Sequence, residues 1–257
     1  MTEFEIGLSE KVDHFEPKQK GRKRRKGKRS KFSSIFWCSL YVFLVFGLCI
    51  SGTWTFIKTY YYPIYVSGSS MAPTLHGGTG DGIHDFGFID TNKSVLKNLQ
   101  RFDIVTTFFP FSSDDYNLPY KIGDKPKEGA SHKIKRIIAL PGDTFTIDDN
   151  EIYFLENGEL TKAQITFDRL LDRTNPVDFK DNNIGDENGF LTLKDNEYYV
   201  MGDNWPDSRD SHQPNDSLSG PVYFENIVGV LVAIVGTCNI SNDQIINRKY
   251  HFPRFYK

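Results

Sequence analysis

The sequence predicts a mainly β domain, with an inserted smaller β region, that follows one N-terminal transmembrane helix. Three observations support this fold class. Residues 32–57 contain no Asp, Glu, Lys, Arg or Pro. After them, runs of β-branched and aromatic residues alternate with clusters of Gly, Pro, Asn and Asp, as strands alternate with turns. Apart from residues 92–99, no later stretch keeps helical spacing for more than about two turns.

Charge is strongly segregated along the chain, although the formal net charge is only -2. Residues 1–31 hold 11 Lys/Arg and 5 Asp/Glu, whereas residues 58–257 hold 20 Lys/Arg and 28 Asp/Glu. Ten of the fourteen residues 18–31 are basic and none is acidic, so this tail is expected to be disordered. Because the basic cluster is a tail and the large domain is acidic, the pattern argues against a nucleic-acid binder.

The uncharged stretch is long enough to cross a bilayer, since about 20 apolar residues span the hydrocarbon core. Trp37 and Trp54 lie near its two ends, as in the aromatic belts of membrane helices. A cleaved secretory signal would have a shorter apolar region and a small-x-small end, and a buried core helix would not follow a run of basic residues. We therefore expect an uncleaved single-pass anchor in the cell membrane, with residues 1–31 cytoplasmic and residues 58–257 extracytoplasmic.

Cysteines and histidines indicate no disulfide and no metal site. Cys38 and Cys49 lie in the apolar stretch, which leaves Cys238 alone in the outer domain. The histidines and acids within residues 76–85 suggest a metal site at first sight, but two histidines in a glycine-rich segment are more often simply part of a loop. We expect neither a metal nor another cofactor.

The outer domain is expected to contain seven strands, with a hairpin turn at Asp149-Asn150. The strands are predicted at residues 64–67, 103–109, 132–140, 144–148, 151–155, 198–201 and 227–235. Residues 76–90, with five glycines, and residues 169–188, rich in Asp and Asn, are predicted loops. Residues 156–196 are interpreted as an insertion between two better-patterned halves.

Three polar segments of this domain are candidates for chemistry. Residues 66–75 read as a turn with a serine pair, residues 133–143 as a buried strand that contains a lysine, and residues 200–212 as a strand followed by a turn rich in Asp, Asn and Ser. Each has an ordinary explanation by itself, because turns use such residues and strand lysines usually reach water.

Taken in order, the segments resemble type I signal peptidases, membrane-bound serine proteases. The matching stretches are residues 70–75 (SMAPTL), 101–110 (RFDIVTTFFP), 135–136 with 140–143 (KR, LPGD), and 201–204 with 207–211 (MGDN, DSRDS). The resemblance covers residues 35–235. Lys135, where the eukaryotic secretory enzyme has histidine, indicates the bacterial type, and Gly68 matches the Gram-positive branch.

The resemblance implies removal of N-terminal signal peptides from exported preproteins at small-x-small sites, with Ser70 as nucleophile and Lys135 as general base. A serine hydroxyl needs a base, and an ammonium group cannot accept its proton. Lys135 must therefore lose its charge near working pH, which burial would favour. In the family pattern Ser208 orients the lysine and Asp210 pairs with Arg136.

The same resemblance implies the substrate contacts and the partners. Residues flanking the dyad would shape small pockets for alanine at positions -1 and -3. These residues are Ile64, Val66, Gly68, Ser69, Met71, Leu75 and Ile134. Expected partners are signal peptides of exported preproteins, the lipid bilayer and, by proximity, the protein secretion machinery.

The chain departs from the family pattern at Trp205 and His212, where arginine is usual, and in residues 76–90. A protonated His212 could serve as the partner of Asp210, which would introduce a pH dependence. Alternatives are a non-catalytic assembly factor, a specialised peptidase for a few exported substrates, and a self-cleaving regulator. The first would be expected to lose Ser70 or Lys135, and the last would need a DNA-binding module.

Overall fold

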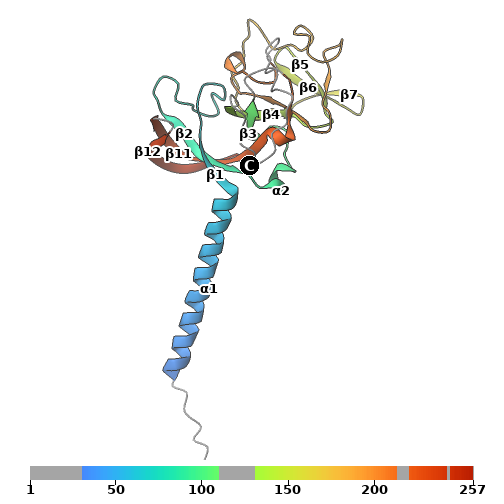
Figure 1. Cartoon of the computed structure of the whole chain (residues 1–257). Helices are drawn as coiled ribbons and strands as arrows, with labels where there is room; N and C mark the ends of the chain where they lie inside the picture. Colours follow the sequence, from blue (N-terminus) through green and yellow to red (C-terminus); the bar gives the residue numbers. More distant parts are fainter. Residues whose placement is uncertain (1–30, 110–130, 213–219, 242–243, 257) are drawn as a thin grey trace, which may run out of the picture. The chain divides into compact units, whose positions relative to one another are not determined.

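The computed structural model describes residues 31–109, 131–212, 220–241 and 244–256. Within these ranges the chain has one long helix and twelve strands, so the predicted mainly β class is confirmed (Figure 1). Met1–Gly52 and Thr53–Lys257 form two separate units. The predicted basic tail, apart from Lys31, lies outside the described residues, as do residues 213–219, which follow the last polar segment.

Helix α1 (Lys31–Tyr60) contains the predicted apolar stretch. Its segment Ile35–Tyr60 is long and apolar enough to cross a membrane by length and composition. Large side chains are exposed all round it, including Trp37 and Phe43. A helix that is apolar on every face has no polar side to turn toward water, which is typical of a membrane span.

Eight strands form the larger sheet, in the order β1-β2-β11-β3-β4-β9-β10 with β12 beside β11. They are β1 (Tyr61–Tyr65), β2 (His84–Asp90), β3 (Ile104–Phe109), β4 (Ser131–Ala139), β9 (Glu197–Met201), β10 (Val222–Tyr223), β11 (Ile227–Ser241) and β12 (Gln244–Phe255). All of their pairings are antiparallel. Each of the five strands predicted in this part of the chain overlaps an observed strand, although β1 ends at Tyr65 and the predicted strand continued to residue 67.

Four strands form the smaller sheet, in the order β7-β6-β5-β8. They are β5 (Thr144–Asp148), β6 (Glu151–Glu156), β7 (Glu159–Lys162) and β8 (Leu191–Thr192). Figure 1 shows β5, β6 and β7 on the side of the larger sheet away from β12. Asp149 and Asn150 have φ values of 45° and 64°, so the predicted hairpin turn is confirmed. Three short helices complete the fold: α2 (Lys93–Leu96), η1 (Trp205–Asp207) and η2 (Phe224–Asn226).

Strand β2 corrects the prediction that residues 76–90 are one loop. Gly87 is one of the five glycines that predict a loop, but it lies in β2 and β11 pairs closely beside it. A Cβ atom at this position would lie 2.2 Å from the carbonyl oxygen of Ala233. Close contact between strands therefore requires glycine here. Strand β12 was also not predicted, because polar and basic residues interrupt its apolar pattern.

The core consists of three clusters of buried side chains. One joins the two sheets, since Phe145 and Ile152 of the smaller sheet belong to the same cluster as Ile138 and Tyr199 of the larger one. A second lies along β3, β4, β9 and β11. The third contains Val66, Met71, Leu75, Ile89, Ile104, Leu231 and Ile234. This third cluster supports the turn that carries Ser70.

Candidate active site

Ser70 lies on a tight turn after β1. Gly68 has a φ of +86°, a conformation that favours glycine, and its N–H donates to the carbonyl of Gly77 at 2.9 Å. Met71 and Leu75, each 1% exposed, anchor the turn in the core and leave Ser70 half-buried. Within the described residues, neither the hydroxyl nor the N–H of Ser70 has a hydrogen-bond partner. The turn therefore presents both groups for other contacts.

The loop after β9 holds this turn through backbone contacts. The N–H of Asn204 donates to the carbonyl of Ser70 at 3.0 Å. Gly202 lies just before it, where a Cβ atom would be 2.2 Å from the Ser70 carbonyl oxygen and 2.3 Å from Ser208 Oγ. The Gly-Asp-Asn motif therefore brings two segments, more than 130 residues apart in sequence, into backbone contact.

Lys135 is a buried lysine in the middle of β4, only 2% exposed. It lies opposite Val105 of β3, and its Nζ donates to Ser208 Oγ at 3.1 Å. Burial lowers the pKa of Lys135 from 10.5 to about 8, because an ammonium loses its hydration there, while Asp210 acts in the opposite direction. About a tenth of this lysine is therefore neutral at pH 7 and about half at pH 8.

Ser208 links Lys135 to a buried carboxylate. Its hydroxyl donates to Asp210 Oδ2, which also accepts the Gly202 N–H at 2.7 Å. His212 contacts the other oxygen through Nδ1. Burial by itself raises the pKa of Asp210, but the attraction of His212, its hydrogen bond, and the further effects of Lys135 and Ser208 outweigh burial and leave the pKa below its ordinary value.

The expected pairing of Arg136 with Asp210 is wrong. Arg136 forms a two-point contact with Asp203, with Nε–Oδ1 at 2.8 Å and Nη2–Oδ2 at 2.6 Å. Asp203 also accepts the hydroxyl of Thr74 at 2.5 Å. Adjacent residues of a strand point to opposite faces, so Arg136 faces away from the Lys135 side, where Asp210 lies. The Arg136–Asp203 pair thus holds the serine turn, through Thr74, against β4.

Replacement of Asp203 by alanine is expected to lower the free energy of unfolding by about 3–5 kcal/mol, because it leaves the buried Arg136 guanidinium unpaired. The two side chains are 7% and 1% exposed. Chemical denaturation in detergent measures the loss. Glu156→Ala is the matched control, since Glu156 pairs with Arg101 at 48% and 30% exposure and should cost at most about 1 kcal/mol. Equal losses in the two variants would contradict this role of Asp203.

A cavity of about 820 Å³ opens beside these residues. Ser70 and Lys135 both line it, although no hydrogen bond joins Ser70 Oγ to Lys135 Nζ. One wall is residues 62–65 of β1 and another is residues 132–135 of β4. The arrangement places a serine hydroxyl, a backbone N–H and a lysine amine around one space.

The seven expected substrate contacts divide into two groups. Ile64, Gly68, Ser69 and Ile134 line the cavity. Val66, Met71 and Leu75 do not line it and are buried in the cluster beneath the turn. The second group supports the position of Ser70 from below, because an apolar side chain at each of these positions packs inward.

Several cavity residues were not singled out from the sequence. They are Thr106, Phe108, His132, Asp207, Arg209 and Glu225. Phe108 and His132 are opposite each other in the β3–β4 register, with ring centroids 4.2 Å apart. Burial lowers the pKa of His132. Both lie on predicted strands, but finding the pair required the register, which the sequence pattern does not specify.

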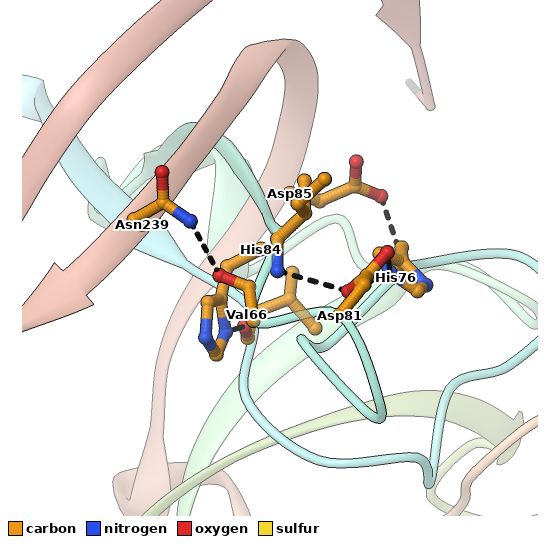
Figure 2. A network of polar contacts seen from close by, with 8 residues as sticks. Val66, His76, Asp81, His84, Asp85 and Asn239 are labelled. Atoms are coloured by element: carbon orange, nitrogen blue, oxygen red, sulfur yellow. Dashed lines mark hydrogen bonds and ion pairs between the residues drawn. The ribbon is translucent and has the colours of Figure 1, made fainter.

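The glycine-rich segment before β2 and the first residues of β2 are held together by polar contacts (Figure 2). His76 Nε2 lies 3.0 Å from both carboxylate oxygens of Asp81. The N–H of His76 donates to Asp85 at 2.9 Å, and His84 Nδ1 donates to the Val66 carbonyl at 2.8 Å. The two histidines and the two aspartates therefore make contacts either with one another or with Val66, at the start of the serine turn.

Comparison with known proteins gives a consistent assignment. A family model described as "Signal peptidase, peptidase S26" matches residues 37–236. Signal peptidase I S of Bacillus subtilis (strain 168) is 29% identical over 158 residues, which are 58% of this chain and 65% of that protein. Signal peptidase I P of Bacillus subtilis subsp. natto is 26% identical over 190 residues, 72% of this chain and 82% of that protein.

A solved structure is also similar. The crystal structure of a signal peptidase I from Enterococcus faecalis V583 is 25% identical and gives a TM-score of 0.31, with coverage of 52% of this chain and 97% of that chain. The match to the Bacillus subtilis (strain 168) signal peptidase I S spans just under two thirds of that relative's length.

Proposed function

We propose an activity for this chain, which belongs to the signal peptidase family, peptidase S26. It is a membrane-anchored serine endopeptidase that removes N-terminal signal peptides from exported preproteins. The observation that carries the proposal is the buried Lys135, whose pKa is lowered to about 8, in the same cavity as Ser70. A lysine that can be neutral near working pH is what a serine nucleophile without histidine requires.

In the proposed reaction Ser70 Oγ attacks the scissile carbonyl carbon while the neutral Lys135 amine takes the hydroxyl proton. The tetrahedral oxyanion accepts a hydrogen bond from the Ser70 N–H. Lys135 then gives the proton to the leaving amine nitrogen as the peptide bond breaks, which leaves an acyl-enzyme. Water, deprotonated by Lys135, attacks the ester, and the returned proton regenerates Ser70. Ser208, hydrogen-bonded to Nζ, orients the lysine.

The ligand-free geometry is compatible with this sequence of steps. In hydrolases without substrate, the hydrogen bond between nucleophile and base is often long and shortens when the substrate binds. Here Lys135 Nζ is held by Ser208 at 3.1 Å on the cavity wall that Ser70 shares. A substrate that fills the cavity would displace water from between the two groups.

The shape of the cavity supports an extended peptide as substrate. Two strand segments, residues 62–65 and 132–135, form its walls. Alternate side chains of an extended peptide would point into it. Ile64, Ile134 and Val228 would limit the pockets to small side chains.

We further propose the domain arrangement and the topology. Residues 1–31 would be cytoplasmic, residues 32–57 would cross the cell membrane once, and residues 58–257 would form the extracytoplasmic catalytic domain, with an insertion at about 156–196. The helix Ile35–Tyr60 and the basic residues that precede it support this orientation. Tethering would raise the local concentration of membrane-bound preproteins, which the secretion machinery delivers nearby.

The substrate assignment predicts a position-dependent loss. The full-length protein in detergent should cleave a preprotein after a small-x-small site, and replacing the -1 alanine by phenylalanine should lower kcat/KM on the order of 100-fold. The same replacement at position -2 is the control, because that side chain of an extended peptide points away from the pockets. Absence of cleavage, or equal cleavage of the -1 and -2 variants, would refute the assignment.

A further inference from the structure

His212 is a buried imidazole close to the lysine that we propose as the base. It is 5% exposed, and its Nδ1 contacts Asp210 Oδ1. Its backbone N–H donates to the same oxygen at 3.2 Å. Asp210 itself is 0% exposed. The histidine is therefore held against a carboxylate that water does not reach.

From Asp210 a continuous set of contacts leads to Lys135. The second carboxylate oxygen accepts the hydroxyl of Ser208, and Ser208 Oγ accepts from Lys135 Nζ at 3.1 Å. Only one side chain, Ser208, separates the lysine from the carboxylate. The charge of Asp210 therefore acts on Lys135 in a site of low dielectric, where charges interact more strongly than in water.

Other charged groups surround the same site, and Lys133, Asp207 and Arg209 line the cavity together with Lys135. Lys135 is influenced by Asp210 first, and then by Lys133, Asp203 and Asp207. Asp203 is paired with Arg136. On the other side of His212 lies the ring of Trp205, with ring centroids 6.5 Å apart, and Arg169 Cζ lies 4.7 Å from the centroid of the Trp205 ring.

Asp210 thus lies between two groups that can carry a proton. His212 and Lys135 both act to lower the pKa of Asp210. When His212 is charged it balances Asp210, and the carboxylate attracts a proton on Lys135 less strongly. When His212 is neutral, the unbalanced carboxylate favours the charged form of Lys135. Histidine, unlike arginine, can lose its charge in the pH range where proteins work.

We propose that His212 is a positioning residue whose charge, transmitted through Asp210 and Ser208, controls how readily Lys135 gives up its proton. The inference rests on the proposed role of Lys135 as general base. It goes beyond that role because it makes the cleavage rate depend on a second ionisable group that does not touch the substrate. If Asp210 links the two charges in this way, the activity profile reports properties of the pair.

Two variants of the full-length protein in detergent test this. In a plot of kcat/KM against pH from 5 to 10, the midpoint of the rising limb should move to higher pH in His212→Gln and to lower pH in His212→Arg. At pH 7 the arginine variant should be on the order of tenfold more active than the glutamine variant, as expected for a shift of about one pKa unit. The difference should appear in kcat rather than KM.

A second background separates the coupling from a structural effect. In Asp210→Asn, which removes the linking charge, His212→Gln should no longer move the midpoint. His251→Gln, an exposed histidine on β12, is the control and should leave the profile unchanged. Identical midpoints in the two His212 variants, or a uniform loss at every pH together with a lower melting temperature, would overturn the inference. A rising limb that survives in Lys135→Met would instead refute the proposed base.

Discussion

Replacement of Ser70 by alanine is expected to abolish preprotein cleavage, with a fall in kcat of at least about 10⁴-fold, because no other group then forms the acyl-enzyme. The fold should be unaffected, since the half-buried hydroxyl makes no hydrogen bond within the described residues. Cleavage of a preprotein by the full-length protein in detergent, compared at equal concentration and equal melting temperature, measures the effect.

Ser94→Ala is the matched control for this variant. Ser94 is exposed on α2 and does not line the cavity, so its loss should leave cleavage unchanged. A Ser70→Ala protein that retained activity comparable to the control would exclude Ser70 as the nucleophile.

Replacement of Lys135 by methionine is expected to abolish cleavage to a similar extent, because methionine fills the same space but accepts no proton. Lys162→Met is the control, since Lys162 lies exposed on β7. Near-normal cleavage by Lys135→Met would exclude Lys135 as the base. Loss in both variants would indicate a general effect of the added apolar side chain.

Lys135→Met can also be tested by a second, independent measurement, the pH dependence of the free energy of unfolding. The pKa of Lys135 is about 8 in the folded protein and 10.5 ordinarily, so between these pH values the unfolded chain binds more protons than the folded one. The free energy of unfolding of the wild type should therefore rise with pH across this window, by up to about 3 kcal/mol in total. In Lys135→Met this rise should be absent. Denaturant unfolding at pH 7.5, 9 and 10.5 measures the two slopes, and parallel slopes would contradict the burial of a neutral lysine.

The strand that precedes the Ser70 turn and the strand that carries Lys135 were predictable because their patterns are local. Residues 132–140 have polar residues on both sides of a run of apolar ones, which is a strand pattern. Asp149-Asn150 is a residue pair typical of a hairpin turn. Strand β2 was not predictable in the same way. Gly87 indicates a loop when only its neighbours in sequence are considered. Glycine is required at this position of the strand because the backbone of β11 lies so close beside it.

The partner of Arg136 shows the same limit within the site. Asp203 and Asp210 lie in one short motif, and both follow closely after the predicted strand at residues 198–201. The family pattern suggested Asp210, whereas the folded loop brings Asp203 to Arg136 and leaves Asp210 with Ser208 and His212. The path of the loop after β9 decides between two chemically equivalent carboxylates.

The sequence by itself determined the order of the parts and indicated the proposed reactive groups: a basic tail, an uncharged stretch of membrane length, and an acidic domain that contains Ser70 and Lys135. Only the tertiary structure decided that Lys135 is buried with a lowered pKa and joined through Ser208 to Asp210 and His212. The physical reason is distance along the chain. Charge and hydropathy patterns depend on neighbouring residues, whereas the contact of Lys135 with Ser208 joins residues 73 positions apart and exists only once strands β4 and β9 have paired.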